Sequence, residues 1–424
     1  MWMIIIFIVT LVMGVPIAFS LGLTAVVGLW QTNPGFLIAI PQKLFSTSSN
    51  YSLMAIPLFI LAGELMGLSG DVVRLMNLAR ALIGRVKGGL AYVSIILGMF
   101  LGGLLGMANA VAALLSTTIF PEMTKDGYEE EFCACFIGAV SIIGPLIPPG
   151  LLLVIYGVAS NTSIAELFMA GVVPGIMVAA ALSLVIFISG KKADWPVSEP
   201  SSLKDIFKAS KKAAFSVLAP FITFVSIAYG VATATEAAAV VCVLVFLVGA
   251  FVYKKIKLKD MSRILIRTAT ISGAILMISA MGGVLGWNLA IAMIPQTIAR
   301  SISSVSNNPL IIILLIQIML FFVGMVMDSA PAVMILVPVL MPVIKQYGID
   351  PVHFGLLMCF NLSIGLLTPP VGTVLYTTST ATGVSADKMV KSIWPWVIVL
   401  AVVLLFVTYV PDSIMWLPRL FAKN

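Results

Sequence analysis

Two short stretches decide the fold: IGPLIPPG at residues 143–150 and IGLLTPPV at residues 364–371. Each lies in the middle of an apolar run that is long enough to cross a lipid bilayer as a helix. Proline lacks the backbone N–H and clashes with the carbonyl one turn earlier, so a proline pair breaks a helix. The sequence therefore predicts the same kind of broken helix twice, at residues 131–160 and 352–382.

The composition is that of a membrane protein. Of the 424 residues, 61% are hydrophobic and only 10% are charged, whereas a soluble domain has about 25% charged residues. Apolar runs of roughly 20 residues recur along the chain, and their hydrophobicity is continuous rather than alternating, which excludes a transmembrane β-barrel. We therefore expect an all-α polytopic membrane protein.

The sequence lacks the motifs of several other function classes. It has one histidine and four cysteines without CxxC spacing, which argues against a zinc or redox site. It has no HExxH, GxSxG or nucleotide-binding motif, so we expect no enzyme, no cofactor and no use of ATP. The net charge of +7 comes from loops between spans and does not indicate a nucleic-acid partner.

The basic loops predict the orientation of the chain. The segments at residues 191–212 and 254–267 are the most basic, and both should be cytoplasmic. The first apolar run has no basic segment before it and no cleavage site, so we interpret it as a retained span. We expect a multi-pass protein of the bacterial inner membrane, surrounded by lipid, with a cytoplasmic N-terminus and a periplasmic C-terminus.

The second half of the chain repeats the first. A shift of 221 residues places Pro121 on Pro342 and Gly144 on Gly365, and it superimposes the two proline pairs without a gap. Basic residues are frequent in one copy and scarce at the equivalent places of the other, which predicts inverted repeats, a pattern typical of secondary transporters. We expect repeats at residues 1–190 and 213–424, joined by a basic cytoplasmic linker at 191–212.

Each repeat is also predicted to contain an arm helix and a re-entrant hairpin. The arm helices are expected at residues 71–87 and 290–308, since the first has charged residues on one face and apolar residues on the other. The hairpins are expected at 88–126 and 309–345, interrupted by GGLLGMANA and VGMVMDSAP. Irregular backbone at membrane depth is tolerated where it is buried in protein or lines a polar cavity, so the tips are candidate sites.

The breaks and the tips together suggest binding sites for an ion and an anion. Carbonyls released by proline can coordinate sodium, and the N–H groups that begin the next half-helix favour an anion. Asn109 and Asp328 are the best side-chain ligands, although Asn109 could instead cap the second hairpin arm. The supporting oxygen donors are Ser141, Ser329, Asn361, Ser363, Thr368 and Thr373. The residues expected to contact a substrate are Asn109, Pro149, Gly150, Ser329, Pro370 and Thr373.

Four motifs resemble those of a known family. They are PEMTKDGY at 121–128, SIIGPLIPPG at 141–150, ELFMAGVVPG at 166–175 and GIDPVHFGLLMCFNLSIGLLTPPVG at 348–372. Together they resemble the large membrane subunit of tripartite ATP-independent periplasmic (TRAP) transporters, over essentially the whole chain. The resemblance implies a sodium-driven elevator-type importer of an organic acid, such as a C4-dicarboxylate or sialic acid. It also implies two partners: a small four-helix membrane subunit and a periplasmic substrate-binding protein.

The resemblance further implies two sodium sites between hairpin tips and broken helices. The first would use Gly106, Asn109, Ser141, Gly144 and Pro145. The second would use Gly324, Asp328, Gly365, Thr368 and Pro369. The first break has Gly150 where a serine often follows the proline pair in the family, which puts a substrate contact there in doubt. The alternative is a stand-alone divalent-anion sodium symporter of the same superfamily, because the last motif is also similar to those proteins.

Overall fold

The computed structural model describes residues 2–83, 86–192, 195, 202–294, 296–297 and 308–421. Within these residues the chain is almost entirely helical and contains no strand. In the described part of the chain, seven helices are long and apolar enough to cross a membrane, and a bent pair of helices would make an eighth span. The prediction of an all-α polytopic membrane protein is confirmed.

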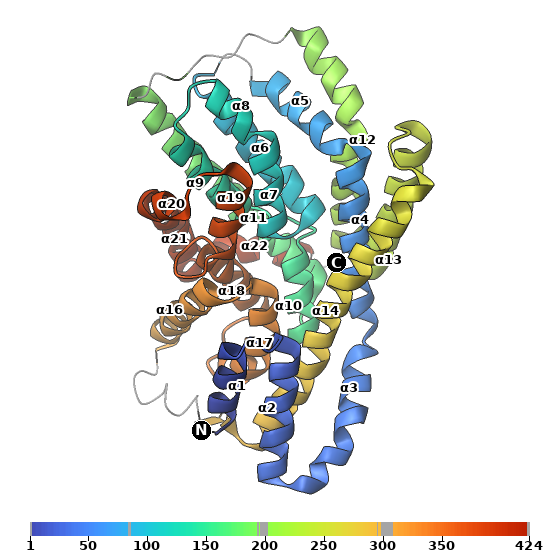
Figure 1. Ribbon diagram of the computed structural model, residues 1–424, viewed down its shortest axis with the longest axis vertical. Coiled ribbons are helices and arrows are strands. Elements are labelled where there is room, and N and C mark those ends of the chain that lie inside the picture. The colour runs from blue at the N-terminus through green and yellow to red at the C-terminus, as the bar shows by residue number, and fades with distance from the viewer. Residues whose placement is uncertain are drawn as a thin grey trace.

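Four helices, α4, α12, α13 and α14, lie together along one side of the molecule (Figure 1). We call α4, α12, α13 and α14 the long-helix group; the smaller helices α1 to α3 pack at one end of α14. The bounds are α1 Trp2–Val12, α2 Ile17–Thr32, a 3-10 helix Pro34–Ala39, α3 Ile40–Ser48, a second 3-10 helix Tyr51–Met54, α4 Ala55–Ser69, α12 Leu203–Ala228, α13 Ala234–Leu247 with a π-helical turn Val248–Val252, and α14 Leu258–Ile291.

The first repeat continues from α4 into an arm helix, a hairpin and a broken helix. The hairpin turns at residues 106–107, and the broken helix is interrupted between α9 and α10, where the first proline pair lies. The bounds are α5 Asp71–Ile83, α6 Gly89–Leu105, α7 Ala108–Thr118, α8 Phe120–Lys125, α9 Glu130–Ser141, α10 Leu151–Ser160 and α11 Ile164–Lys192. Proline and glycine end these helices where the sequence predicts the breaks.

The second repeat also contains a hairpin followed by a broken helix. Its hairpin turns at residues 327–328, and its broken helix is interrupted between α18 and α19, around the second proline pair. The bounds are α16 Pro309–Val326, α17 Ser329–Gln346, α18 Pro351–Gly365, α19 Thr373–Thr382, α20 Ala386–Ser392, α21 Trp394–Tyr409 and α22 Asp412–Phe421. The helices α6 to α10 and α16 to α19 form what we call the hairpin group.

The two hairpins approach the centre of the molecule from opposite ends. In Figure 1, α5, α8 and the start of α6 lie near the top, whereas α17 lies in the lower half. This arrangement is what inverted repeats require. Of the expected second arm helix at 290–308, residues 290–291 end α14, and residues 295 and 298–307 lie outside the described residues. Of the linker expected at 191–212, residues 191–192 end α11 and residues 203–212 begin α12, which Ser202 caps, so the charged residues there extend a helix; residues 193–194 and 196–201 lie outside the described residues.

Candidate functional site

A pair of glycines holds each hairpin against the broken helix of its own repeat. A Cβ on Gly102 of α6 would lie 2.7 Å from the Cα of Gly144, beside the first break. A Cβ on Gly365 of α18 would lie 2.6 Å from the Cα of Gly324 of α16. Only glycine permits such contact between two backbones. The close contact places each hairpin tip next to a break.

The second arm of each hairpin packs against the other repeat. Helix α7 contacts α19, and α17 contacts α10, so each second arm lies beside the half-helix that follows the other repeat's break. The N-termini of these four helices therefore converge on one region. Each helix N-terminus carries a partial positive charge and free N–H groups, which favour an anion.

A hydrogen-bonded group of three side chains joins the hairpin tips. Asn109 Nδ2, in the first turn of α7, donates to Asp328 Oδ2 at 3.0 Å and to Thr373 Oγ1 at 3.2 Å. Asp328 is the residue before α17, and Thr373 is the first residue of α19. The contact unites both hairpin tips and the second break in one site, although Asn109 and Asp328 are 219 residues apart.

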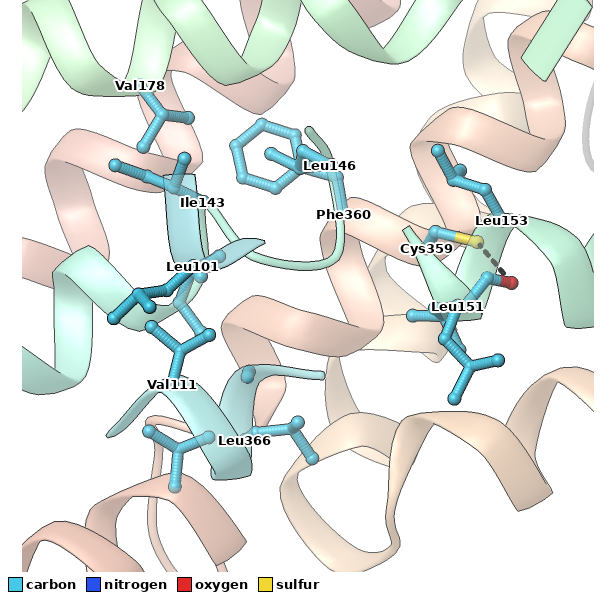
Figure 2. Close-up of a cluster of buried hydrophobic side chains, with 14 of the residues drawn as sticks. Leu101, Val111, Ile143, Leu146, Leu151, Leu153, Val178, Cys359, Phe360 and Leu366 are labelled. Carbon is cyan, nitrogen blue, oxygen red and sulfur yellow. Dashed lines mark hydrogen bonds between the residues drawn. The ribbon is translucent and has the colours of Figure 1, made fainter. Parts of the chain in front are cut away.

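A small cavity of about 70 Å³ lies at this contact. Its polar lining side chains are Asn109, Asp328 and Ser329, and within the described part of the chain no lysine, arginine or histidine lines it. The surrounding core is apolar: Figure 2 shows Leu101, Val111, Ile143, Leu146, Leu151 and Leu366 among the buried side chains near the first break. Among the residues that the structure describes, Asp328 is thus the only charged side chain in the cavity wall.

Two polar atoms in the cavity wall have no hydrogen-bond partner among the described residues. Asn109 Oδ1 and Ser329 Oγ are buried and make no hydrogen bond. A buried polar atom without a partner is costly, so such atoms mark places where an ion, water or substrate would bind. Together with the Asp328 carboxylate, they form a set of hard oxygen donors, and this set fits sodium. No cluster of three or more His, Cys, Asp or Glu side chains occurs in the described residues.

The residues of the first expected sodium site are only partly brought together. Gly106, Asn109 and Pro145 line the cavity, and Gly106 ends α6 with a φ of +61°. Gly144 forms the glycine contact described above. Ser141 is fully buried, and its Oγ donates to the carbonyl of Gly138 in its own helix at 2.7 Å.

The residues of the second expected sodium site are also only partly brought together. Asp328 lines the cavity, whereas Gly324 and Gly365 form the helix contact. Thr368 is fully buried, and its Oγ1 donates to the Gly365 carbonyl at 2.7 Å. Pro369 is partly buried at the break. One released carbonyl, that of Leu366, already accepts the N–H groups of Val374 and Leu375, so it is satisfied by α19.

The expected substrate residues also fall into two sets. Asn109, Ser329 and Thr373 lie at the cavity or contact it. Pro149 and Gly150 are buried outside its lining, with Gly150 against the carbonyl of Pro145, and Pro370 is exposed. The supporting donors Ser363 and Asn361 also lie elsewhere, with hydrogen bonds to Cys359 O and to Gln317, respectively.

Three contacts of the hairpins are not predicted from the sequence. Gln317 of α16 bonds to Asn361, and it is a polar residue in an otherwise apolar helix, which was a usable signal. Gly102 aligns with Gly324 at a shift of 222 rather than 221, so the gap-free alignment does not pair them. The contact between Asn109 and Asp328 had no sequence signal, because neither repeat alone contains both residues.

Comparisons with known proteins agree with this architecture. The family model "Tripartite ATP-independent periplasmic transporter, DctM component" matches residues 4–413. The sialic acid TRAP transporter large permease protein SiaM of Vibrio cholerae is 36% identical over 408 residues, which are 96% of each chain. The C4-dicarboxylate TRAP transporter large permease protein DctM of Pseudomonas aeruginosa is 34% identical over 400 residues, which are 94% of each.

A solved structure shares the fold at low sequence identity. The YdaH transporter of Alcanivorax borkumensis superimposes with a TM-score of 0.64 at 12% identity, over 90% of this chain and 89% of that one. The expected transporter fold is thereby confirmed. The family consists of transporter permeases rather than enzymes. The site at the hairpin tips, the repeated glycine contacts and the family match over nearly the whole chain lead to one conclusion: this protein belongs to the DctM family of TRAP transporter large permeases.

Proposed function

We propose that this protein is the transport subunit of a sodium-coupled importer of an organic acid in the bacterial inner membrane. The observation that carries the proposal is the contact of Asn109 with Asp328 and Thr373, beside two buried oxygen atoms without partners. Secondary transport of organic acids follows from the family. Sodium coupling, the substrate and the motion are inferred here from the site.

The charges in the cavity wall support a cation that accompanies an anionic substrate. Asp328 and a substrate carboxylate would repel each other, and no basic side chain of the described residues lines the cavity. The N-termini of α7, α10, α17 and α19 supply only partial positive charges. A sodium ion held by Asp328 and neighbouring oxygens would neutralise the repulsion, which makes binding of the ion and of the acid interdependent.

The size of the cavity indicates that the hairpins must move. A volume of about 70 Å³ accommodates an ion or a few water molecules, whereas ligand sites for small organic molecules measure ~300–1,000 Å³. The tips must therefore separate to admit the acid, at the expense of the contact between Asn109 and Asp328. We infer that the hairpin group moves as a unit against the long-helix group, in an elevator motion.

The proposal includes two partners, which the word "tripartite" in the family description supports. They are a small membrane subunit and a periplasmic substrate-binding protein. The names of two relatives, which specify sialic acid and C4-dicarboxylate, support an organic acid as the substrate. The family match favours this assembly over the stand-alone symporter. A cytoplasmic N-terminus and a periplasmic C-terminus remain part of the proposal.

The test is the thermal stability of the purified protein in sodium against potassium at equal ionic strength. An ion that binds only the folded state at a hundredfold excess over Kd stabilises it by about 2.7 kcal/mol. We expect a sodium-specific increase that Asp328→Asn abolishes. The control Asp387→Asn, on the exposed side of α20, should keep the increase.

The same variants should then be assayed with both partners in proteoliposomes. We expect uptake of the acid driven by a sodium gradient in the control, and none in Asp328→Asn. Sodium coupling would be refuted if the thermal stability were equal in sodium and potassium and the rate of uptake did not depend on the sodium gradient. Uptake without the binding protein would favour the stand-alone symporter.

A further inference from the structure

A second cavity lies between α6 of the hairpin group and α12 of the long-helix group, beside α11, and its lining is almost entirely apolar. Its volume is about 260 Å³, and every lining side chain comes from an apolar residue of α6, α11, α12 or the first break. Ile147 and Pro148 form its inner wall, so it reaches the broken segment itself. The cavity is separate from the site at the hairpin tips, since the two sets of lining residues share no member.

The cavity opens on the surface that faces the hydrocarbon of the bilayer. Ile176 of α11 and Phe221 of α12 stand at its edge, with 50% and 59% of their surfaces exposed. Both helices are long and apolar enough to span the membrane. Water has no polar partner in such a cavity and does not fill it. The occupant must be apolar and must come from the membrane.

The depth and volume of the cavity fit the end of a lipid chain. Phe221 lies nine residues beyond Lys212, the last charged residue in the first part of α12, and Met99 of α6 lies ten residues from the start of its helix. At 1.5 Å per residue these are about 14 and 15 Å of helix. Since each leaflet contributes half of a ~30 Å hydrocarbon core, this depth is where acyl chains end. A methylene group occupies a volume similar to the ~30 Å³ of a water molecule, so the cavity holds roughly nine.

We propose that this cavity binds the terminal half of an acyl chain from a bilayer phospholipid, wedged between α12 and the first proline break. The chain packs against Ile147 and Pro148 on one side and against Val217 on the other. It fills a space that would otherwise separate the hairpin group from the long-helix group. The phospholipid is therefore a structural ligand at the interface between the hairpin group and the long-helix group.

The proposal predicts a dependence on chain length rather than on head group. The delipidated protein in a short-chain detergent should be titrated with phosphatidylglycerol that carries either two 16-carbon chains or two 8-carbon chains. We expect the long-chain lipid to raise the unfolding midpoint by on the order of 3 °C. The short-chain lipid should raise it much less, because its chains end before they reach the cavity.

Variants of the cavity wall identify the binding site. Val217→Phe and Val172→Phe each fill the cavity from a different helix, so each should lose most of the response to the long-chain lipid. Val217→Ala enlarges the cavity and should increase the response. Leu218→Phe is the matched control, because Leu218 is the next residue of α12, is 48% exposed and does not line the cavity.

The outcomes separate the proposal from general effects of lipid. An unchanged response in Val217→Phe and Val172→Phe would overturn it, as would an equal response to the two chain lengths. If a filling variant does not fold, the Val217→Ala variant decides, since a response no greater than that of the wild type contradicts the proposal. None of these variants alters Asn109, Asp328 or Thr373, so the result is independent of sodium coupling.

Discussion

At the scale of single residues, Asn109 is the centre of the site. Its amide nitrogen donates to side chains from two other elements, at the tip of the second hairpin and after the second break. An aspartate at membrane depth is costly unless its charge is compensated by hydrogen bonds or a counter-ion. Asn109 supplies one such hydrogen bond to Asp328, while its side-chain amide oxygen, Oδ1, remains available to a ligand.

We predict that Asn109→Ala lowers the free energy of unfolding by about 1–3 kcal/mol, because Asp328 loses a buried partner. Thr373→Val removes the hydroxyl that accepts the other hydrogen bond from Asn109. A double-mutant cycle of Asn109→Ala and Thr373→Val, measured by thermal unfolding, should give a coupling energy of about 0.5–3 kcal/mol. Additive effects of the two substitutions would contradict the contact.

At the scale of elements, the glycine contacts determine how closely each hairpin approaches its broken helix. Gly102 meets Gly144 in the first repeat, and Gly324 meets Gly365 in the second. Because the same contact occurs in both repeats, it is a property of the hairpin and broken-helix unit. Without it, the tips would stand farther from the breaks and the four helix N-termini would not converge.

We predict that Gly102→Ala destabilises the protein by about 1–3 kcal/mol, since its Cβ would overlap with backbone that cannot move aside. The matched control is Gly67→Ala in α4, where a Cβ would meet nothing within 4 Å. That control should be neutral or slightly stabilising, because alanine favours a helix over glycine by ~1 kcal/mol. Equal unfolding midpoints for the two variants would show that the contact is not close.

At the scale of the whole molecule, the arm helix α5 connects the two groups of helices. At its start, the fully buried Asp71 accepts a hydrogen bond from Ser216 of α12 at 2.5 Å and pairs with Arg74 at 3.1 Å. Near its end, Arg80 forms an ion pair with Glu122 of α8, in the first hairpin. One end of α5 is thus bound to the long-helix group and the other end to the hairpin group. A helix that couples the motion of the two groups would need both contacts.

We predict that Asp71→Ala lowers the free energy of unfolding by about 1–3 kcal/mol, because Ser216 is left buried without its partner. Uptake by the reconstituted importer should fall as well if α5 guides the motion. Asp412→Ala is the control: its pair with Arg419 is exposed, and its loss should change stability by less than about 1 kcal/mol. If Asp71→Ala changed the free energy of unfolding and the rate of uptake no more than Asp412→Ala does, an anchoring role for Asp71 would be excluded.

Much of the fold followed from local patterns. The breaks in α9–α10 and α18–α19, and the turns of both hairpins, occur where prolines and glycines interrupt apolar runs. These features depend on the backbone of a few neighbouring residues, and such effects can be predicted from sequence. The positions of Ser141 and Thr368 could not, because a buried hydroxyl can donate to its own helix instead of facing a shared site.

The amino-acid sequence by itself determined that the chain is a membrane protein of two related halves, each with a hairpin and a proline-broken helix. The physical reason is that hydrophobicity and the missing N–H of proline act locally. Only the tertiary structure decided that the halves share one site. Asn109 and Asp328 meet because the second arm of each hairpin packs against the half-helix of the other repeat, and that choice depends on how whole helices fit together.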